Sequence, residues 1–149
     1  GWVTSLCTYT DKHGQRKLVS GSLDQMVRVW DIGGLGFPVE VGHCIQVLRG
    51  HGADVTSLAS FRNAFGKPRV VSGGLDATLR IWDPERGAHL ANYVLDDPVG
   101  DIVVLQDAAP AGAGMAAEAK GGDDDEIIAA VLFRTSRAPA YVSITTPSL

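Results

Sequence analysis

The sequence contains an internal duplication, and this feature constrains the fold more than any other. The segment Trp2–Asp31, WVTSLCTYTDKHGQRKLVSGSLDQMVRVWD, aligns without a gap on Asp54–Asp83, DVTSLASFRNAFGKPRVVSGGLDATLRIWD. The offset is 52 residues, from position 2 to position 54. The copies share the run V-T-S-L, one loop glycine, V-S-G, L-D, an arginine and the closing Trp-Asp. Because repetition at a fixed period is the signature of repeat architectures, we expect units that bury their cores against neighbouring units.

Each copy has the residue pattern of short β-strands separated by turns, with β-branched runs and alternation of apolar and polar residues. The expected strands are Val3–Leu6, Leu18–Ser20, Val27–Trp30 and Cys44–Leu48 in the first copy, and Val55–Leu58, Arg69–Ser72, Thr78–Trp82 and His89–Leu95 in the second. Four short antiparallel strands per unit make one blade of a β-propeller. We expect Gly21, Gly73 and Gly74 to lie at tight turns, where glycine tolerates a positive φ.

Short motifs in both copies resemble the WD-repeat family. Gly50-His51 opens the second copy, Trp82-Asp83 closes it, and the turn S-G-x-x-D occurs at Ser20–Asp24 and again at Ser72–Asp76. These elements match the Gly-His and Trp-Asp signatures of WD repeats. The resemblance covers residues 1–95 and implies an all-β fold, a partial WD-repeat β-propeller built of four-stranded antiparallel blades.

The sequence divides into three expected units. Residues 1–53 form a first blade that lacks its opening Gly-His, residues 54–97 a second, and residues 98–149 a degenerate third. Within the third unit, the Ala/Gly-rich and acidic stretch at about 106–126 predicts a disordered insertion, because it offers little apolar surface to bury. The loop Ile32–Gly42 lengthens the first unit and is either a surface insertion or a partner contact. Since a first histidine would precede Gly1, we expect the sequence to belong to a longer polypeptide.

The resemblance implies that several polar residues form a buried, structural hydrogen-bond chain rather than a catalytic site. In the second blade, this chain would join His51, Ser72, Asp76 and Trp82, so that each buried polar group finds a partner. In the first blade, it would retain Ser20, Asp24 and Trp30. A Ser-His-Asp catalytic triad is the competing interpretation. Repetition of the serine and aspartate in both copies favours a scaffold.

Family resemblance also places the partner-binding surface. The loops from strand four to the next strand one, and from strand two to strand three, share one rim of a propeller. The candidate rim residues are Trp2, Leu23, Gln25, Asp54, Leu75 and Ala77. An exposed tryptophan is a candidate interaction hot spot, although Trp2 could equally pack on a neighbouring loop.

Composition excludes several classes of function. There are 13 basic and 17 acidic residues, for a formal net charge of −4, which does not favour nucleic acid as a partner. The sequence contains no apolar run of 18 residues, so it predicts no membrane-spanning helix.

The two cysteines have no metal-ligand spacing and are expected to be unreactive thiols of an intracellular protein, cytoplasmic or nuclear. The sequence has no phosphate-binding glycine loop, and we expect no enzyme activity, no cofactor and no metal site.

The leading functional hypothesis is a protein-interaction scaffold or adaptor subunit of a larger complex, which binds partners through its rim loops. Further blades, from the full-length chain or from another subunit, would complete the ring. The alternative is a non-catalytic propeller subunit of an RNA-modifying enzyme, since the second and third units loosely resemble the propeller subunit of tRNA guanine-N7 methyltransferase. Fold alone does not decide between these functions.

Overall fold

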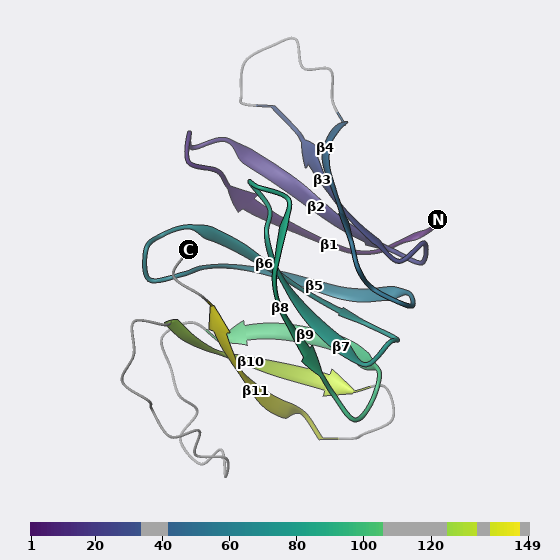
Figure 1. The fold of residues 1–149 in the computed structure, drawn as a ribbon. Helices are drawn as coiled ribbons and strands as arrows, with labels where there is room; N and C mark the ends of the chain where they lie inside the picture. The colour runs from purple at the N-terminus through teal and green to yellow at the C-terminus, as the bar shows by residue number, and fades with distance from the viewer. Residues whose placement is uncertain (34–41, 106–124, 134–137, 147–149) are drawn as a thin grey trace.

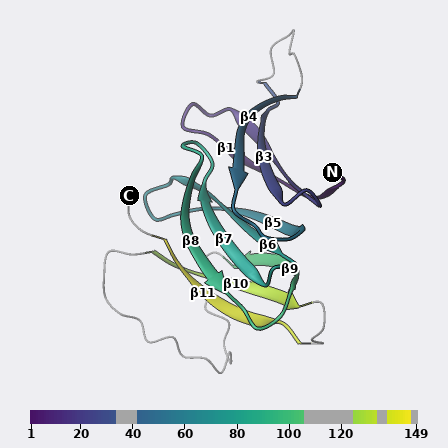
Figure 2. The same ribbon diagram turned by 45° about the vertical axis from the view of Figure 1, so that its right-hand side comes forward.

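The computed structural model consists of three antiparallel β-sheets stacked face to face (Figures 1 and 2). It describes residues 1–33, 42–105, 125–133 and 138–146, with residues 125–133 and 146 described by their backbone alone. This described part of the chain contains strands and turns and no helix. The chain is therefore all-β, and its two four-stranded sheets have the architecture of propeller blades.

The first two sheets have the same topology, with four strands in sequence order. The first sheet consists of β1 (Val3–Thr10), β2 (Arg16–Ser22), β3 (Met26–Asp31) and β4 (His43–Arg49). The second consists of β5 (Val55–Arg62), β6 (Pro68–Gly74), β7 (Thr78–Asp83) and β8 (Ala88–Val94). Both carry a register shift at the same place in the first strand, between Val3 and Ser5 and between Val55 and Ser57. The duplication in sequence is thus a duplication in structure.

The third sheet has three strands, in the order β11-β10-β9. They are β9 (Val99–Leu105), β10 (Asp125–Phe133) and β11 (Ala140–Thr146). β10 begins at Asp125, close to the expected end of the insertion at about residue 126. Most of the expected insertion, and most of the loop Ile32–Gly42, lie outside the described residues.

Two apolar cores lie between the three sheets. Between the first and second sheets, Val27, Val29 and Leu48 meet Val55, Leu58 and Trp82. Between the second and third sheets, the buried residues are Phe61, Val71, Leu79, Ile81, Val99, Ile102 and Ile144. Neighbouring side chains of a strand point to opposite faces, so Val70 of β6 enters the first core and Val71 enters the second. Every residue of β6 is buried because this strand has a sheet on each side.

The glycines of the S-G-x-x-D turns have a different role from the expected one. Gly21, Gly73 and Gly74 do not have positive φ; the positive φ values of these turns belong to Gln25 (69°) and Ala77 (55°). A Cβ atom on Gly21 would lie 2.7 Å from Val55 Cγ1, and one on Gly73 would lie 2.5 Å from Val99 Cγ1. Glycine is required at positions 21 and 73 because the first strand of the following sheet packs directly against the backbone there.

Candidate functional site

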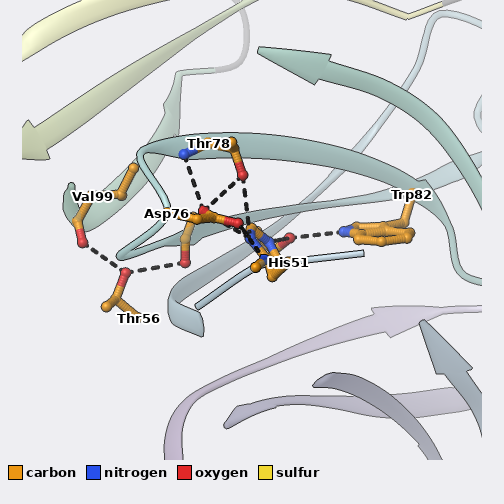
Figure 3. A network of polar contacts seen from close by, with 9 residues as sticks. His51, Thr56, Asp76, Thr78, Trp82 and Val99 are labelled. Atoms are coloured by element: carbon orange, nitrogen blue, oxygen red, sulfur yellow. Dashed lines mark hydrogen bonds and ion pairs between the residues drawn. The ribbon is translucent and has the colours of Figure 1, made fainter. Parts of the chain in front are cut away.

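The loop between β4 and β5 brings His51 against the second sheet, where it meets residues from β6 and β7 (Figure 3). His51 Nε2 lies 2.7 Å from Ser72 Oγ, and Trp82 Nε1 donates a hydrogen bond to the same oxygen at 2.8 Å. Ser72 is fully buried, and the His51 and Trp82 side chains are almost so. The structure therefore brings together these three residues, which were predicted from the sequence, and both hydrogen bonds between them are buried.

Asp76 holds the other side of the His51 ring. Its Oδ2 atom lies 3.0 Å from His51 Nδ1 and accepts a hydrogen bond from the Gly52 amide at 2.8 Å. Its Oδ1 atom accepts a hydrogen bond from Thr78 Oγ1 at 2.8 Å. Thr78 and Gly52 were not predicted from the sequence. The signal for Thr78 was present, because a hydroxyl residue two positions after an aspartate can bond to its carboxylate.

The hydrogen bonds run in one direction along this chain of groups. The Trp82 indole can only donate, and the Asp76 carboxylate can only accept. Ser72 accordingly accepts from Trp82 and donates to His51 Nε2, while His51 Nδ1 carries the proton that Asp76 accepts. The neutral imidazole satisfies every bond, since it has one donor and one acceptor nitrogen.

The pKa values of both ionisable groups favour these protonation states. Burial lowers the pKa of His51 below its ordinary value, although the Asp76 carboxylate opposes this shift. For Asp76, burial raises the pKa, but hydrogen bonds from Gly52, Thr78 and His51 outweigh it, and the net pKa is lowered. A neutral histidine therefore donates to an ionised aspartate near neutral pH.

A Ser-His-Asp arrangement of this kind differs from a nucleophilic triad in two respects. In a triad, the serine hydroxyl must reach a substrate. Here Ser72 has no exposed surface, and its oxygen already accepts a hydrogen bond from Trp82. The hydrogen bonds among His51, Ser72, Asp76 and Trp82 join β6, β7 and the β4–β5 loop.

The first sheet carries part of the same arrangement. Trp30 Nε1 donates to Ser20 Oγ at 2.8 Å, as Trp82 does to Ser72. Asp24, however, pairs with Arg28 at 2.8 Å and accepts from the Met26 amide at 3.1 Å. The aspartate that contacts histidine in the second sheet contacts arginine in the first.

The six candidate rim residues lie at one end of the first two sheets. The Leu23 amide donates to the Trp2 carbonyl at 3.0 Å, and the Leu75 amide donates to the Asp54 carbonyl at 2.9 Å. Each turn after strand two is therefore tied to the segment that enters strand one of its own sheet. Trp2 is 82% exposed and Leu23 is 42% exposed, whereas Leu75 is half-buried. Gln25 is exposed, and Asp54 and Ala77 are half-buried.

The two cysteines, Cys7 and Cys44, are free thiols, and both are half-buried. Burial raises the pKa of Cys7 to about 12, so its reactive thiolate form is scarce at neutral pH. Among residues 1–33, 42–105 and 138–146, no group of three His, Cys, Asp or Glu side chains could hold a metal ion. No helix in the described part of the chain is long and apolar enough to cross a membrane.

Repeated four-stranded antiparallel sheets, stacked face to face and each containing a Trp–Ser hydrogen bond, define the class as β-propeller repeat proteins. The chain belongs to the WD-repeat family. The family model described as "WD domain, G-beta repeat" matches residues 1–31 and 42–83. WD-repeat proteins are generally non-catalytic scaffolds that bind other proteins.

Several curated proteins resemble the chain over its repeats. The F-box/WD repeat-containing protein sel-10 of Caenorhabditis elegans is 38% identical over 84 residues, which is 56% of this chain and 12% of that protein. The small ribosomal subunit protein RACK1 of the same organism is 32% identical over 98 residues, 63% of this chain and 28% of that protein. The ribosome biogenesis protein YTM1 of Vanderwaltozyma polyspora is 34% identical over 101 residues, 68% of this chain and 18% of that protein. The chain thus spans less than a third of the length of each of these relatives.

Proposed function

We propose that the chain is part of a protein-interaction scaffold or adaptor subunit that binds partners through the rim containing Trp2 and Leu23. The observation that carries this proposal is the exposure of these two large apolar side chains at neighbouring loops, which a backbone hydrogen bond holds together. Aromatic side chains on a rigid surface are typical hot spots of protein interfaces. The division into repeat units 1–53, 54–97 and 98–149 is part of the same proposal.

The names of the relatives support a role inside larger assemblies. One is named as an F-box protein, one as a small ribosomal subunit protein and one as a ribosome biogenesis protein. No contact in the described structure favours the alternative, a non-catalytic subunit of an RNA-modifying enzyme, over a general scaffold. That alternative predicts co-purification with a methyltransferase subunit.

A further blade, from the same polypeptide or another subunit, is proposed to cover the open face of the first sheet. Val3 and Leu6 are each 58% exposed on this face. Their equivalents in the second sheet, Val55 and Leu58, are 0% and 6% exposed because the first sheet covers them. Repeat units bury their cores only against neighbours, so this face is suited to another unit.

Affinity capture with rim variants tests the interaction proposal. The double variant Trp2→Ala, Leu23→Ser should lose bound partners while its unfolding midpoint stays near that of the unmodified chain. The matched control is Phe65→Ser, which removes an apolar side chain of 59% exposure from the β5–β6 turn at the opposite rim. Retention of every partner by the double variant, or equal loss by the control, would count against this rim as the binding surface.

A further inference from the structure

Lysine and arginine residues are concentrated at one end of the first two sheets, opposite the rim that contains Trp2. The β1–β2, β5–β6 and β7–β8 turns lie at this end (Figure 1). With their flanking residues they form the segments 10–17, 62–69 and 83–87, which contain seven lysines and arginines and three acidic residues. The whole chain, by contrast, has 13 basic and 17 acidic residues. These three segments are called the basic rim below.

The rim at the other end of the same sheets has the opposite charge. Its four loop segments, 22–26, 50–54, 74–78 and 95–97, contain five aspartates and no lysine or arginine. Exposed charges select a partner of complementary charge and guide its approach. The two ends of the sheets are therefore suited to different partners.

Hydrogen bonds join the three turns of the basic rim into one surface. The Arg62 guanidinium donates to the Thr10 carbonyl of the first sheet at 2.9 Å, and also to the Gly66 carbonyl of its own turn. The Lys12 amide donates to Glu85 Oε1, in the β7–β8 turn, at 2.8 Å. The positions of the three turns are thus fixed before a partner binds, which lowers the entropic cost of binding.

The β1–β2 and β5–β6 turns also have the same internal hydrogen bonds. Asp11 Oδ1 accepts a hydrogen bond from the Gln15 amide at 2.9 Å. Asn63 Oδ1, at the equivalent position of the second sheet, accepts one from the Lys67 amide at 2.8 Å. Both turns therefore hold their backbone in a defined conformation, and the Asp11 carboxylate is engaged within its own turn.

Other acidic residues at this end are paired with buried cations. Lys17 Nζ lies 2.9 Å from Asp31 Oδ1, and Arg69 Nη1 lies 3.2 Å from Asp83 Oδ2. The side chains of Lys17 and Arg69 are both buried, so these two pairs leave little charge at the surface. Four further cations are exposed and come from all three turns: Lys12, Arg16, Lys67 and Arg86.

We propose that the basic rim binds an acidic peptide segment of a partner protein, in which several aspartates or glutamates lie close together. The exposed cations are spread over three turns, and this spacing suits carboxylates on successive residues of an extended peptide. A nucleic acid fits less well, because Asp11 and Glu85 lie half-buried among the cations and a nucleic-acid strand carries a charge about every 3.4 Å. This surface is additional to the rim that contains Trp2 and does not depend on it.

Fluorescence anisotropy of a labelled oligoglutamate peptide tests the proposal on the full chain. We expect binding that weakens as salt is added, because exposed charges are screened beyond a Debye length of about 8 Å at physiological ionic strength. A labelled oligouridylate of the same length is measured in parallel and should bind more weakly. Urea unfolding of each variant described below checks that its fold is retained.

Charge reversal at exposed lysines locates the binding surface. Lys12→Glu with Lys67→Glu should weaken oligoglutamate binding about tenfold, because two attractions are replaced by repulsions. Lys67→Glu alone should weaken it about threefold. The matched control is Arg49→Glu, which makes the same change in net charge at an exposed position at the other end of the sheet and should have little effect. Phe65→Ser keeps every cation of the basic rim and should bind oligoglutamate as the unmodified chain does.

Each outcome of the binding experiment bears on the proposal. Absence of oligoglutamate binding would overturn it, and so would equal weakening by Lys67→Glu and Arg49→Glu. Tighter binding of oligouridylate would overturn the choice of an acidic peptide as the partner. Loss of binding in Phe65→Ser would contradict recognition by charge. None of these variants changes Trp2 or Leu23, so the proposal for the other rim is tested separately.

Discussion

Trp82 Nε1 and Ser72 Oγ are 2.8 Å apart in the second sheet, and the equivalent atoms of Trp30 and Ser20 are 2.8 Å apart in the first. The two pairs differ in their surroundings. Trp82 is 1% exposed and lies in the core between two sheets, whereas Trp30 is half-buried on the open face. The same hydrogen bond is therefore present in two environments. Comparing variants at both sites separates the contribution of the hydrogen bond to stability from that of the packing of the tryptophan ring.

Replacing Trp82 by phenylalanine removes the indole donor and part of a buried ring. We expect the free energy of unfolding to fall by about 2–4 kcal/mol, since a hydrogen bond and close packing are lost together. Trp30→Phe should cost about 1 kcal/mol, because water already reaches its ring. Urea unfolding of both variants measures the difference. Equal losses at the two sites would show that the preceding sheet does not determine the contribution of the tryptophan.

Replacing Gly73 by alanine tests the close approach of Val99. The added Cβ would lie 2.5 Å from Val99 Cγ1, so the third sheet must shift away, at a cost of about 1–3 kcal/mol. Gly52→Ala is the control, because the nearest atom to its Cβ is 4.0 Å away and its amide still donates to Asp76. Chemical denaturation measures both. A tolerated alanine at position 73 would contradict the explanation given for this glycine.

Stability should decrease as the pH falls below about 6.5, the ordinary pKa of histidine. Burial lowers the pKa of His51 in the folded chain, so below that pH the unfolded chain binds the proton more readily. The stabilisation by neutral His51 is thus fully present above pH 6.5 and is lost as the pH falls towards the folded-state pKa. Burial also lowers the pKa of His89, which adds an effect of the same sign.

Urea midpoints at pH 7.5 and pH 5.5 measure this dependence. His51→Gln should be less stable at both pH values and should show a smaller difference between them. The control is His13→Gln, at an exposed position in the β1–β2 turn, which should leave the pH dependence as it is. If His51→Gln kept the full difference, other groups would be responsible for it.

Replacing Ala77 by glycine should stabilise the chain by about 0.5–1 kcal/mol, because φ is +55° there and only glycine adopts this region without steric cost. The same change at Gln25, where φ is +69°, should act in the same direction. Ala59→Gly in the middle of β5 is the opposite case and should destabilise, since glycine weakens a strand interior. Thermal unfolding distinguishes these signs.

Much of the fold could be predicted from local patterns. The strand alternation and the Trp-Asp and Gly-His motifs predicted the two four-stranded sheets, because strand formation depends on neighbouring residues. The residues that meet around His51 could also be anticipated from the family motifs. Asp24 was expected in the same kind of hydrogen-bond chain in the first sheet, and in the structure it pairs with Arg28.

The role of the glycines was misjudged. A glycine before a turn suggests a positive φ, and nothing near Gly73 in the sequence indicates that Val99, 26 positions away, will approach it. The identity of the V-T-S-L runs was visible at once, but the Thr4 and Thr56 hydroxyls of these runs contact strands that the sequence does not place beside them.

By itself, the sequence determined the duplication, the strand pattern and the set of polar residues that each unit repeats, because these depend on spacing along the chain. Only the tertiary structure decided which of those residues face a neighbouring sheet. Contacts between residues 40 or more positions apart, such as Thr56 with Val99 and Leu58 with Ser5, exist only after the sheets have stacked. Their energies depend on distances across an interface, and a linear pattern does not contain those distances.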